Sequence, residues 1–269
     1  RHLAADDETL VSMAASAATK ALADAGVDPG RVDQVVLATC SMPDPIPGGA
    51  PRVADAIGAS GAGAYDLNGA CAGFCYALSA ASDAVRTGSA EYVVVAGAER
   101  LSGWVDWTDR SSAILFGDGA GAVVVGPSDR PGIGPLISGS DGTGFELIAM
   151  SETHHVSLNG PAVFRWATTT LGEVARRVCA SAGIEPADLD AVVLHQANLR
   201  IINAIAKELG APNAVVAADV VDTGNTSAAS VPLALTRLRR EGKVAAGDLA
   251  LTLAFGAGLT WAGAVIEVP

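Results

Sequence analysis

The sequence predicts an α/β protein built from two duplicated halves, and three observations lead to this prediction. Apolar, strand-like runs alternate with Ala-rich helical stretches, which is typical of sheets that are covered by helices. Segments of the first half recur in the second half at a constant separation of 157 residues. Apolar residues make up 50% of the 269-residue chain and aromatic residues only 4%, which favours close packing of small side chains.

Each expected element follows from a local pattern. Asp7–Thr9 precedes an Ala-rich amphipathic stretch that stops before Gly26 and Pro29, as a helix does. Short Val-rich runs bounded by turn residues indicate buried strands, and the stretch 41–51, rich in proline and glycine, indicates a loop. The expected helices cover residues 7–25, 52–57 and, after Cys71, the stretch to Gly88, and the expected strands cover residues 32–39, 92–96, 114–116 and 122–125, the last two joined across a glycine turn.

The duplication fixes the expected domain organisation. The run 25–29 reappears as 182–186, and 77–79 reappears as 234–236 at the same separation. Phe116–Gly119 is echoed by Phe255–Gly258 with a drifted spacing. We read this as two copies of one α/β unit, at 1–127 and 128–269, with a site between them.

Charge and cysteine usage exclude several classes of function. A formal net charge of −12 argues against non-specific nucleic-acid binding, and no apolar run approaches the roughly 20 residues of a membrane span. The first residues of this sequence do not have the pattern of a signal peptide, and we expect none. Its four cysteines, Cys40, Cys71, Cys75 and Cys179, form no CxxC pair, so we expect neither a disulfide framework nor a metal site. The expected compartment is the reducing cytoplasm.

Cys71 is the first candidate for chemistry. It lies where a short extended stretch turns into a helix, after the small residues Asn68, Gly69 and Ala70. The positive end of a helix favours a thiolate, so we expect a pKa below the free value of about 8.5. A small buried core cysteine is the alternative. At the 157-residue separation Cys71 corresponds to Ala228, so the duplicated frame carries only one such thiol.

Three further positions could complete a site. His195 follows the strand-like run 192–194, where side chains point into the crevice of an α/β sheet, although a structural histidine is equally compatible. Asn225 lies in a polar turn and could simply cap a helix. Gly256–Gly258 could turn its N–H groups toward an anion or could be an ordinary hairpin turn.

Five motifs, in order along the whole chain, resemble those of the β-ketoacyl-acyl-carrier-protein synthase III family. They cover residues 70–74, 116–121, 195–200, 224–230 and 255–258. The resemblance implies the thiolase-like fold, with two duplicated α/β halves in a five-layered α/β/α/β/α core. It implies an acyltransferase in which an acyl-CoA acylates a cysteine, and a decarboxylative condensation with malonyl-ACP then starts a fatty-acid or polyketide chain.

The same resemblance implies a role for individual residues. Cys71 would be the nucleophile, His195 and Asn225 its two partners, and the N–H groups of Cys71 and Ala257 the oxyanion hole. Further residues are implied in the sites for CoA or phosphopantetheine (Arg110, Gly160, Phe164, Ala197, Asn198), for acyl carrier protein (Arg165, Arg200, Lys207) and for the acyl chain (Ile46, Phe116). No permanently bound cofactor is implied; acyl-CoA and malonyl-ACP are substrates, and the family implies a homodimer in which the 40–51 loop reaches the neighbouring pocket.

Other functions on the same scaffold predict different residues. A thiolase needs a second cysteine near the C-terminal glycine turn, and residues 254–259 contain none. A non-enzymatic subunit would be expected to lack Cys71 or His195. Acyl transfer to a hydroxyl or amine without decarboxylation remains the main alternative, with His195 as general base; the presence of Asn225 favours decarboxylation.

Overall fold

The computed structural model describes residues 1–110 and 112–269. Its α-helices are α1 (Leu10–Ala25), α2 (Ala50–Ala56), α3 (Gly73–Arg86), α4 (Gly160–Ser181), α5 (Leu199–Leu209), α6 (Val220–Thr223) and α7 (Ser230–Arg240). The strands are β1 (Gln34–Ala38), β2 (Gly63–Leu67), β3 (Val93–Arg100), β4 (Asp118–Val125), β5 (Ile137–Ser140), β6 (Ile148–Met150), β7 (Val156–Leu158), β8 (Ala191–Leu194), β9 (Val215–Val216), β10 (Leu249–Gly256) and β11 (Thr260–Glu267). Short 3₁₀ turns include η1 (Pro29–Arg31), η2 (Ala70–Ala72), η3 (Leu101–Trp104), η4 (Gly142–Leu147), η5 (Pro186–Asp188) and η6 (Ser227–Ala229).

Two mixed sheets form the frame. The first has the order β2-β1-β3-β4, with β4 antiparallel to its parallel neighbours. The second has the order β5-β11-β10-β8-β9, in which β8, β9 and β10 are parallel and β11 is antiparallel. The strands of the first sheet all lie within residues 34–125 and those of the second within 137–267. A separate hairpin, β6–β7, carries His154 and His155 at its turn.

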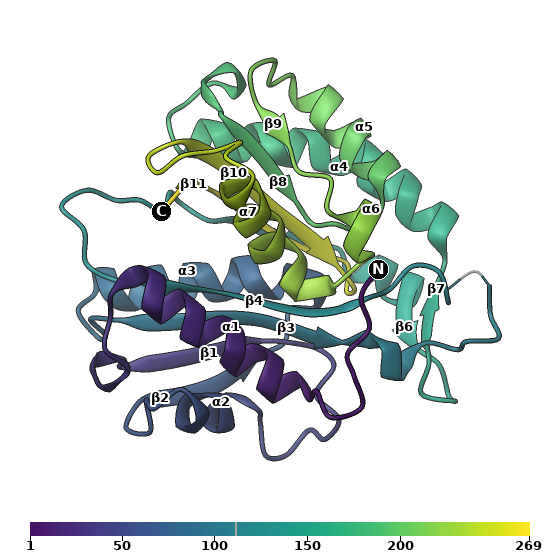
Figure 1. Cartoon of the computed structure of the whole chain (residues 1–269). Coiled ribbons are helices and arrows are strands. Elements are labelled where there is room, and N and C mark those ends of the chain that lie inside the picture. The colour runs from purple at the N-terminus through teal and green to yellow at the C-terminus, as the bar shows by residue number, and fades with distance from the viewer. Residues whose placement is uncertain (111) are drawn as a thin grey trace.

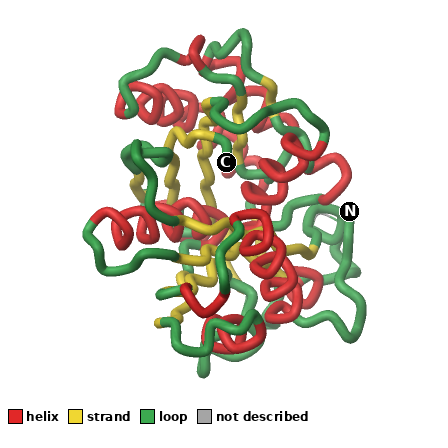
Figure 2. Tube along the Cα trace, turned by 60° about the vertical axis from the view of Figure 1, so that its left-hand side comes forward, coloured by secondary structure: helices red, strands yellow, loops and turns green. Residues whose placement is uncertain are grey.

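Helices cover these sheets in layers, and α3 and α7 lie between the two sheets (Figure 1). The buried apolar residues of α1 and α2 pack on the outer face of the first sheet, and those of α4 and α5 pack on the outer face of the second. The view in Figure 2 shows the strands as two groups separated by helices. The predicted five-layered α/β/α/β/α core is therefore confirmed.

Alternation along each buried strand explains why the core splits in this way. In β1, Val35 and Leu37 face α1 and α2, whereas Val36 and Ala38 face the central helices. In β8, Val192 and Leu194 face α4 and α5 in the same manner. Successive side chains of a strand point to opposite faces, so a continuous apolar run serves two cores at once.

The duplication extends to the backbone around the site. The turns η2 and η6 are 157 residues apart, as are the first residues of α3 and α7. Ala70 and Ser227, one from each turn, both have a left-handed backbone, with φ of 46° and 47°. Two residues with different side chains have the same rarely populated backbone conformation at equivalent positions, as expected of two copies of one unit.

One expected element is wrong. Residues 114–116 do not form a strand that pairs with β4; residues 112–115 form a turn, and Phe116 pairs instead with Asn225 in the second half. The N–H of Gly117 donates to the Asn225 carbonyl at 3.0 Å, and the N–H of Asn225 donates to the Leu115 carbonyl at 2.9 Å. This long-range pairing satisfies the polar backbone that a local hairpin would have satisfied.

Among the described residues, none of the helices combines the length and the apolar character needed to cross a bilayer.

Candidate active site

Cys71 is held at the junction of the two halves by the turn η2. It lies two residues before the start of α3, and the preceding Asn68 side chain accepts a hydrogen bond from the N–H of Ala70 at 3.1 Å. Gly256, the last residue of β10, packs directly against it. A Cβ atom added to Gly256 would lie 2.8 Å from the nitrogen of Cys71 and 2.9 Å from its Cβ. Only glycine therefore fits there, and the next residue, Ala257, begins the turn beside Cys71.

The surroundings of Cys71 change the expected acidity of its thiol. Burial raises the pKa of Cys71 to about 12; contact with the Ser227 hydroxyl opposes this rise, and the negative charge of Glu99 adds to it. The expectation of a lowered pKa is therefore wrong for the free chain. The loss of water around the sulfur and the nearby carboxylate outweigh the end of α3.

His195 directly follows β8 and is 2% exposed. Its backbone N–H donates to the Leu253 carbonyl on β10 at 2.8 Å. Its ring contacts Phe255 edge-on, with the two ring centroids 5.2 Å apart. Phe255 contacts His195, and the next residue, Gly256, contacts Cys71. Adjacent residues of one strand thus bring the imidazole and the thiol to the same end of the second sheet.

A buried serine is the hydrogen-bond partner of one ring nitrogen of His195. His195 Nδ1 and the Ser230 hydroxyl lie 2.7 Å apart, and the same hydroxyl oxygen accepts the backbone N–H of Gln196 at 3.2 Å. When the hydroxyl donates to Nδ1, the ring proton lies on Nε2, which is then a donor. Burial lowers the pKa of His195 to about 3, so the imidazole is neutral at neutral pH.

Asn225 lies between Phe116 and the turn η6 and is 9% exposed. Its side-chain oxygen accepts the N–H of Ser227 at 2.8 Å. That bond occupies the acceptor end of the carboxamide, so the NH₂ end remains as a donor. The equivalent residue of the first half, Asn68, makes the same bond to the N–H of Ala70. The positions equivalent to His195 and Cys71, however, are Ala38 and Ala228.

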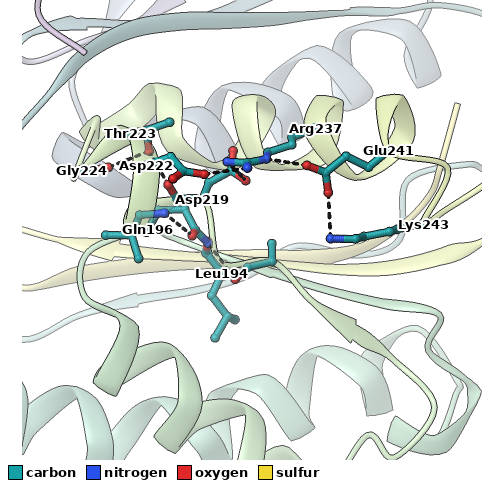
Figure 3. A network of polar contacts seen from close by, with 11 residues as sticks. Leu194, Gln196, Asp219, Asp222, Thr223, Gly224, Arg237, Glu241 and Lys243 are labelled. Carbon is teal, nitrogen blue, oxygen red and sulfur yellow. Dashed lines mark hydrogen bonds and ion pairs between the residues drawn. The ribbon is translucent and has the colours of Figure 1, made fainter. Parts of the chain in front are cut away.

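A second set of polar contacts holds the segment that leads into Asn225 (Figure 3). The buried Gln196 side chain donates to the Leu194 carbonyl at 2.7 Å and accepts the N–H of Val220 at 3.1 Å. Arg237 on α7 contacts Asp222 at 2.6 Å and Asp219 at 3.7 Å. The residue after His195 and a helix of the central layer therefore both brace α6, and with it the Asn225 turn.

Comparisons with known proteins identify the family of the chain. The family model described as 3-oxoacyl-[acyl-carrier-protein] synthase III matches residues 65–142, and the model of its C-terminal part matches residues 179–268. The chain is 50% identical over 273 residues to β-ketoacyl-[acyl-carrier-protein] synthase III 4 of Streptomyces coelicolor, covering 100% of this chain and 86% of that protein. The chain belongs to the 3-oxoacyl-acyl-carrier-protein synthase III family.

Solved structures of synthase III relatives have the same fold. The priming β-ketosynthase of the R1128 polyketide pathway superposes with a TM-score of 0.98 at 46% identity, covering 100% of this chain and 84% of that one. The synthase III of Aquifex aeolicus superposes with a TM-score of 0.95 at 41% identity, covering 99% of this chain and 87% of that one. The thiolase-like architecture expected from the motifs is therefore confirmed.

The remaining predicted residues fall into two groups. One group gathers at α4 and α5, which pack against each other: Gly160, Phe164, Arg165, Ala197, Asn198, Arg200 and Lys207. Within it, the Arg200 guanidinium lies over the Phe164 ring at 5.8 Å, which joins a residue expected for CoA to one expected for the carrier protein. The second group is spread: Phe116 is buried beside Asn225, Arg110 is exposed in the loop before β4, and Ile46 is 83% exposed.

Sequence reasoning missed Glu99, which is fully buried beside Cys71. One signal was available: a carboxylate continues the apolar run of β3, and such a residue is rarely buried without a function or strong hydrogen bonds. At the separation of 157 residues, Glu99 corresponds to Gly256. Of the two equivalent positions, Gly256 packs against Cys71 and the charge of Glu99 acts on the Cys71 thiol.

Proposed function

We propose that the chain catalyses the first condensation of a fatty-acid or polyketide chain, joining an acyl group from acyl-CoA to malonyl-ACP with loss of carbon dioxide. One observation supports the proposal: the adjacent residues Phe255 and Gly256 of β10 contact the neutral His195 imidazole and Cys71, and the Asn225 carboxamide keeps a free donor end. The equivalent positions on the other side hold Ala228, Ala38 and Asn68 and lack a thiol and an imidazole.

In the first step the Cys71 sulfur attacks the thioester carbon of the acyl-CoA. The N–H groups of Cys71 and Ala257 stabilise the oxyanion, and loss of one such donor typically costs about 100- to 1,000-fold. The carbon–sulfur bond to CoA breaks, and the thiol proton of Cys71 ends on the departing CoA sulfur. The exchange is neutral overall, which suits a thiol whose pKa is about 12.

In the second step malonyl-ACP occupies the same cleft. Its thioester oxygen accepts hydrogen bonds from Nε2–H of His195 and from the Asn225 amide. Decarboxylation places negative charge on that oxygen, so the two donors bind the enolate more strongly than the ground state. The carbanion attacks the acyl group on Cys71, the carbon–carbon bond forms, and the Cys71 sulfur leaves as a thiolate that takes up one proton from solvent to restore the thiol.

The substrates enter from the side of α4 and α5 in this proposal. Arg165, Arg200 and Lys207 are exposed there and form a local basic surface on a chain with a net charge of −12. Such a surface attracts an acidic carrier protein and steers its approach. The proposal needs no permanently bound cofactor.

We further propose a cytoplasmic homodimer. All four cysteines are free thiols, as is typical of reducing compartments. The strand β2 is an edge strand, and Ile46 in the neighbouring loop is 83% exposed. An unpaired edge beside an exposed apolar side chain is a surface that a second copy can cover. Light scattering in solution tests this, and a monomer would contradict it.

The test of the function is a reaction with acyl-CoA and malonyl-ACP in which released carbon dioxide and the mass of the carrier-bound product are followed. We expect equal amounts of carbon dioxide and β-ketoacyl-ACP from the unmodified chain, and no β-ketoacyl-ACP from Cys71→Ala. Transfer of the acyl group to a hydroxyl or amine without carbon dioxide would instead establish simple acyl transfer.

A further inference from the structure

Glu99, near the end of β3, is a buried carboxylate for which the condensation chemistry provides no role. Its side chain is 0% exposed. None of the ion pairs among the described residues involves it. Burial of such a group without a cation is costly unless hydrogen bonds replace the lost water.

Hydrogen-bond donors from both halves provide that replacement. From the end of β1, the Thr39 hydroxyl donates to Oε2 at 3.1 Å, the N–H of Ser41 donates to Oε2 at 3.1 Å, and the N–H of Cys40 lies 3.3 Å from each oxygen. The Ser41 hydroxyl also donates to Oε2. These contacts all belong to the first half of the chain.

The other oxygen faces the second half. Ser227 in η6 donates its hydroxyl to Oε1 at 2.9 Å, and the N–H of Ala228 approaches the same oxygen at 3.5 Å. The sulfur of Cys40 contacts both Oε1, at 3.4 Å, and the Ser227 hydroxyl, at 3.8 Å. One carboxylate therefore joins the end of β1 to the turn that follows Asn225.

The link continues from Ser227 to the carboxamide. The N–H of Ser227 donates to Asn225 Oδ1 at 2.8 Å, while the hydroxyl of the same residue is held by Glu99. Ser227 has φ of 47°, a conformation that most residues avoid. The hydroxyl and the backbone N–H of Ser227 thus hold this residue in its strained conformation. The position of Ser227 in turn determines where the side-chain oxygen of Asn225 is held.

We propose that Glu99 is a positioning residue for the decarboxylation step, acting on Asn225 through Ser227. The proposal rests on the function proposed above. In this proposal Glu99, which belongs to the other half of the chain, sets the orientation of the Asn225 NH₂ group. That orientation determines how well the NH₂ group stabilises the enolate. Misplacement of a catalytic donor by about 1 Å can cost about 100-fold in rate, so a positioning error of part of that size has a measurable effect.

The test separates the two half-reactions. Acylation of Cys71 is followed by intact mass after mixing with acyl-CoA, and carbon dioxide release is followed after malonyl-ACP is added to the acylated protein. The variants are Glu99→Gln, Ser227→Ala and the control Thr39→Val, which also removes one hydroxyl bond to Glu99, but from the side away from Asn225. Ala70 has the same backbone conformation as Ser227, so alanine fits at position 227.

The quantity compared is the rate of carbon dioxide release by protein that is already fully acylated, because Glu99 and Ser227 also act on the Cys71 thiol and so change the acylation rate. We expect the rate of carbon dioxide release to fall about ten- to 100-fold in Glu99→Gln and in Ser227→Ala, and to stay within about threefold of the unmodified chain in Thr39→Val. In the double variant Glu99→Gln/Ser227→Ala it should fall no further than in the more impaired single variant, because both break the same link.

An unchanged rate of carbon dioxide release by acylated Glu99→Gln, or an equal fall in Thr39→Val, would overturn the positioning role and leave Glu99 a structural residue. Should Glu99→Gln fail to fold, the comparison of Ser227→Ala with Thr39→Val decides the matter alone, and an unchanged rate of carbon dioxide release by acylated Ser227→Ala overturns the proposal. Failure of the unmodified chain to acylate or to release carbon dioxide would instead contradict the proposed function itself.

Discussion

The contact between Gly256 and Cys71 gives a sharp test, because it depends on a single missing methyl group. In Gly256→Ala the new Cβ would lie 2.8 Å from the nitrogen of Cys71 and 2.9 Å from its Cβ. Ordinary contacts of a Cβ begin at 3.4 Å, so β10 and η2 must separate by about 0.6 Å. The nucleophile then moves relative to the N–H of Ala257, which is the other half of the proposed oxyanion hole.

A displacement of this size should slow acylation of Cys71 about ten- to 100-fold. Overpacking of a close contact should also lower the free energy of unfolding by about 1–3 kcal/mol. Single-turnover acylation by acyl-CoA, read by intact mass, measures the first effect, and chemical denaturation measures the second.

The control is Gly121→Ala, where a new Cβ would lie 2.9 Å from the Cβ of Pro232 on α7, in a contact that does not involve Cys71. We expect a comparable loss of stability with little change in acylation. If Gly256→Ala is acylated as fast as the unmodified chain, the close approach of β10 does not position the nucleophile, and the reasoning fails.

Four further changes test the site. Asn225→Asp keeps the oxygen that accepts the Ser227 N–H and changes only the donor end, so carbon dioxide release should fall at least 100-fold while acylation persists; equal losses in both steps would contradict this. Because the pKa of Cys71 is about 12, its alkylation by iodoacetamide should accelerate about tenfold per pH unit from pH 7 to 10, and a plateau below pH 8.5 would contradict the burial argument. His195 is protonated near pH 6.5 in the unfolded chain and only near pH 3 in the folded chain. The free energy of unfolding should therefore fall by up to about 5 kcal/mol as the pH falls between these values. Denaturation curves should show a smaller fall in His195→Gln. Arg200→Glu should raise the KM for malonyl-ACP about three- to tenfold at low salt and less at high salt, whereas the equal charge change Arg240→Glu on α7 should not.

The fold could be predicted well because its signals are local and repeated. Buried strands such as β1 and β8 read as short apolar runs, and the separation of 157 residues pairs η2 with η6 and the start of α3 with that of α7. Residues 114–116 escaped prediction because their pairing partner, Asn225, lies far away in the sequence and belongs to the other half. An apolar stretch such as residues 114–116 beside glycines is also typical of a local hairpin, and only tertiary contacts decide between the two pairings.

The candidate site divides in the same way. Cys71, His195 and Asn225 stand in motifs, so their side chains could be named from the sequence. The electrostatic environment of Cys71 could not, because the pKa of a thiol depends on how much water the assembled halves exclude and on Glu99, which is near the sulfur only in the folded chain. Ser230 illustrates the same point: it is hydrogen-bonded to the ring of His195 although it lies 35 residues away in the sequence.

The measurement that tests the account most directly is intact mass spectrometry of the protein after incubation with a panel of acyl-CoA thioesters, followed by peptide mapping. We expect the mass of one acyl group on the chain, located on Cys71, released when malonyl-ACP is added, and absent from Cys71→Ala. An acyl group on another residue, or none with any thioester, would contradict the claim that this thiol between the two halves is the nucleophile.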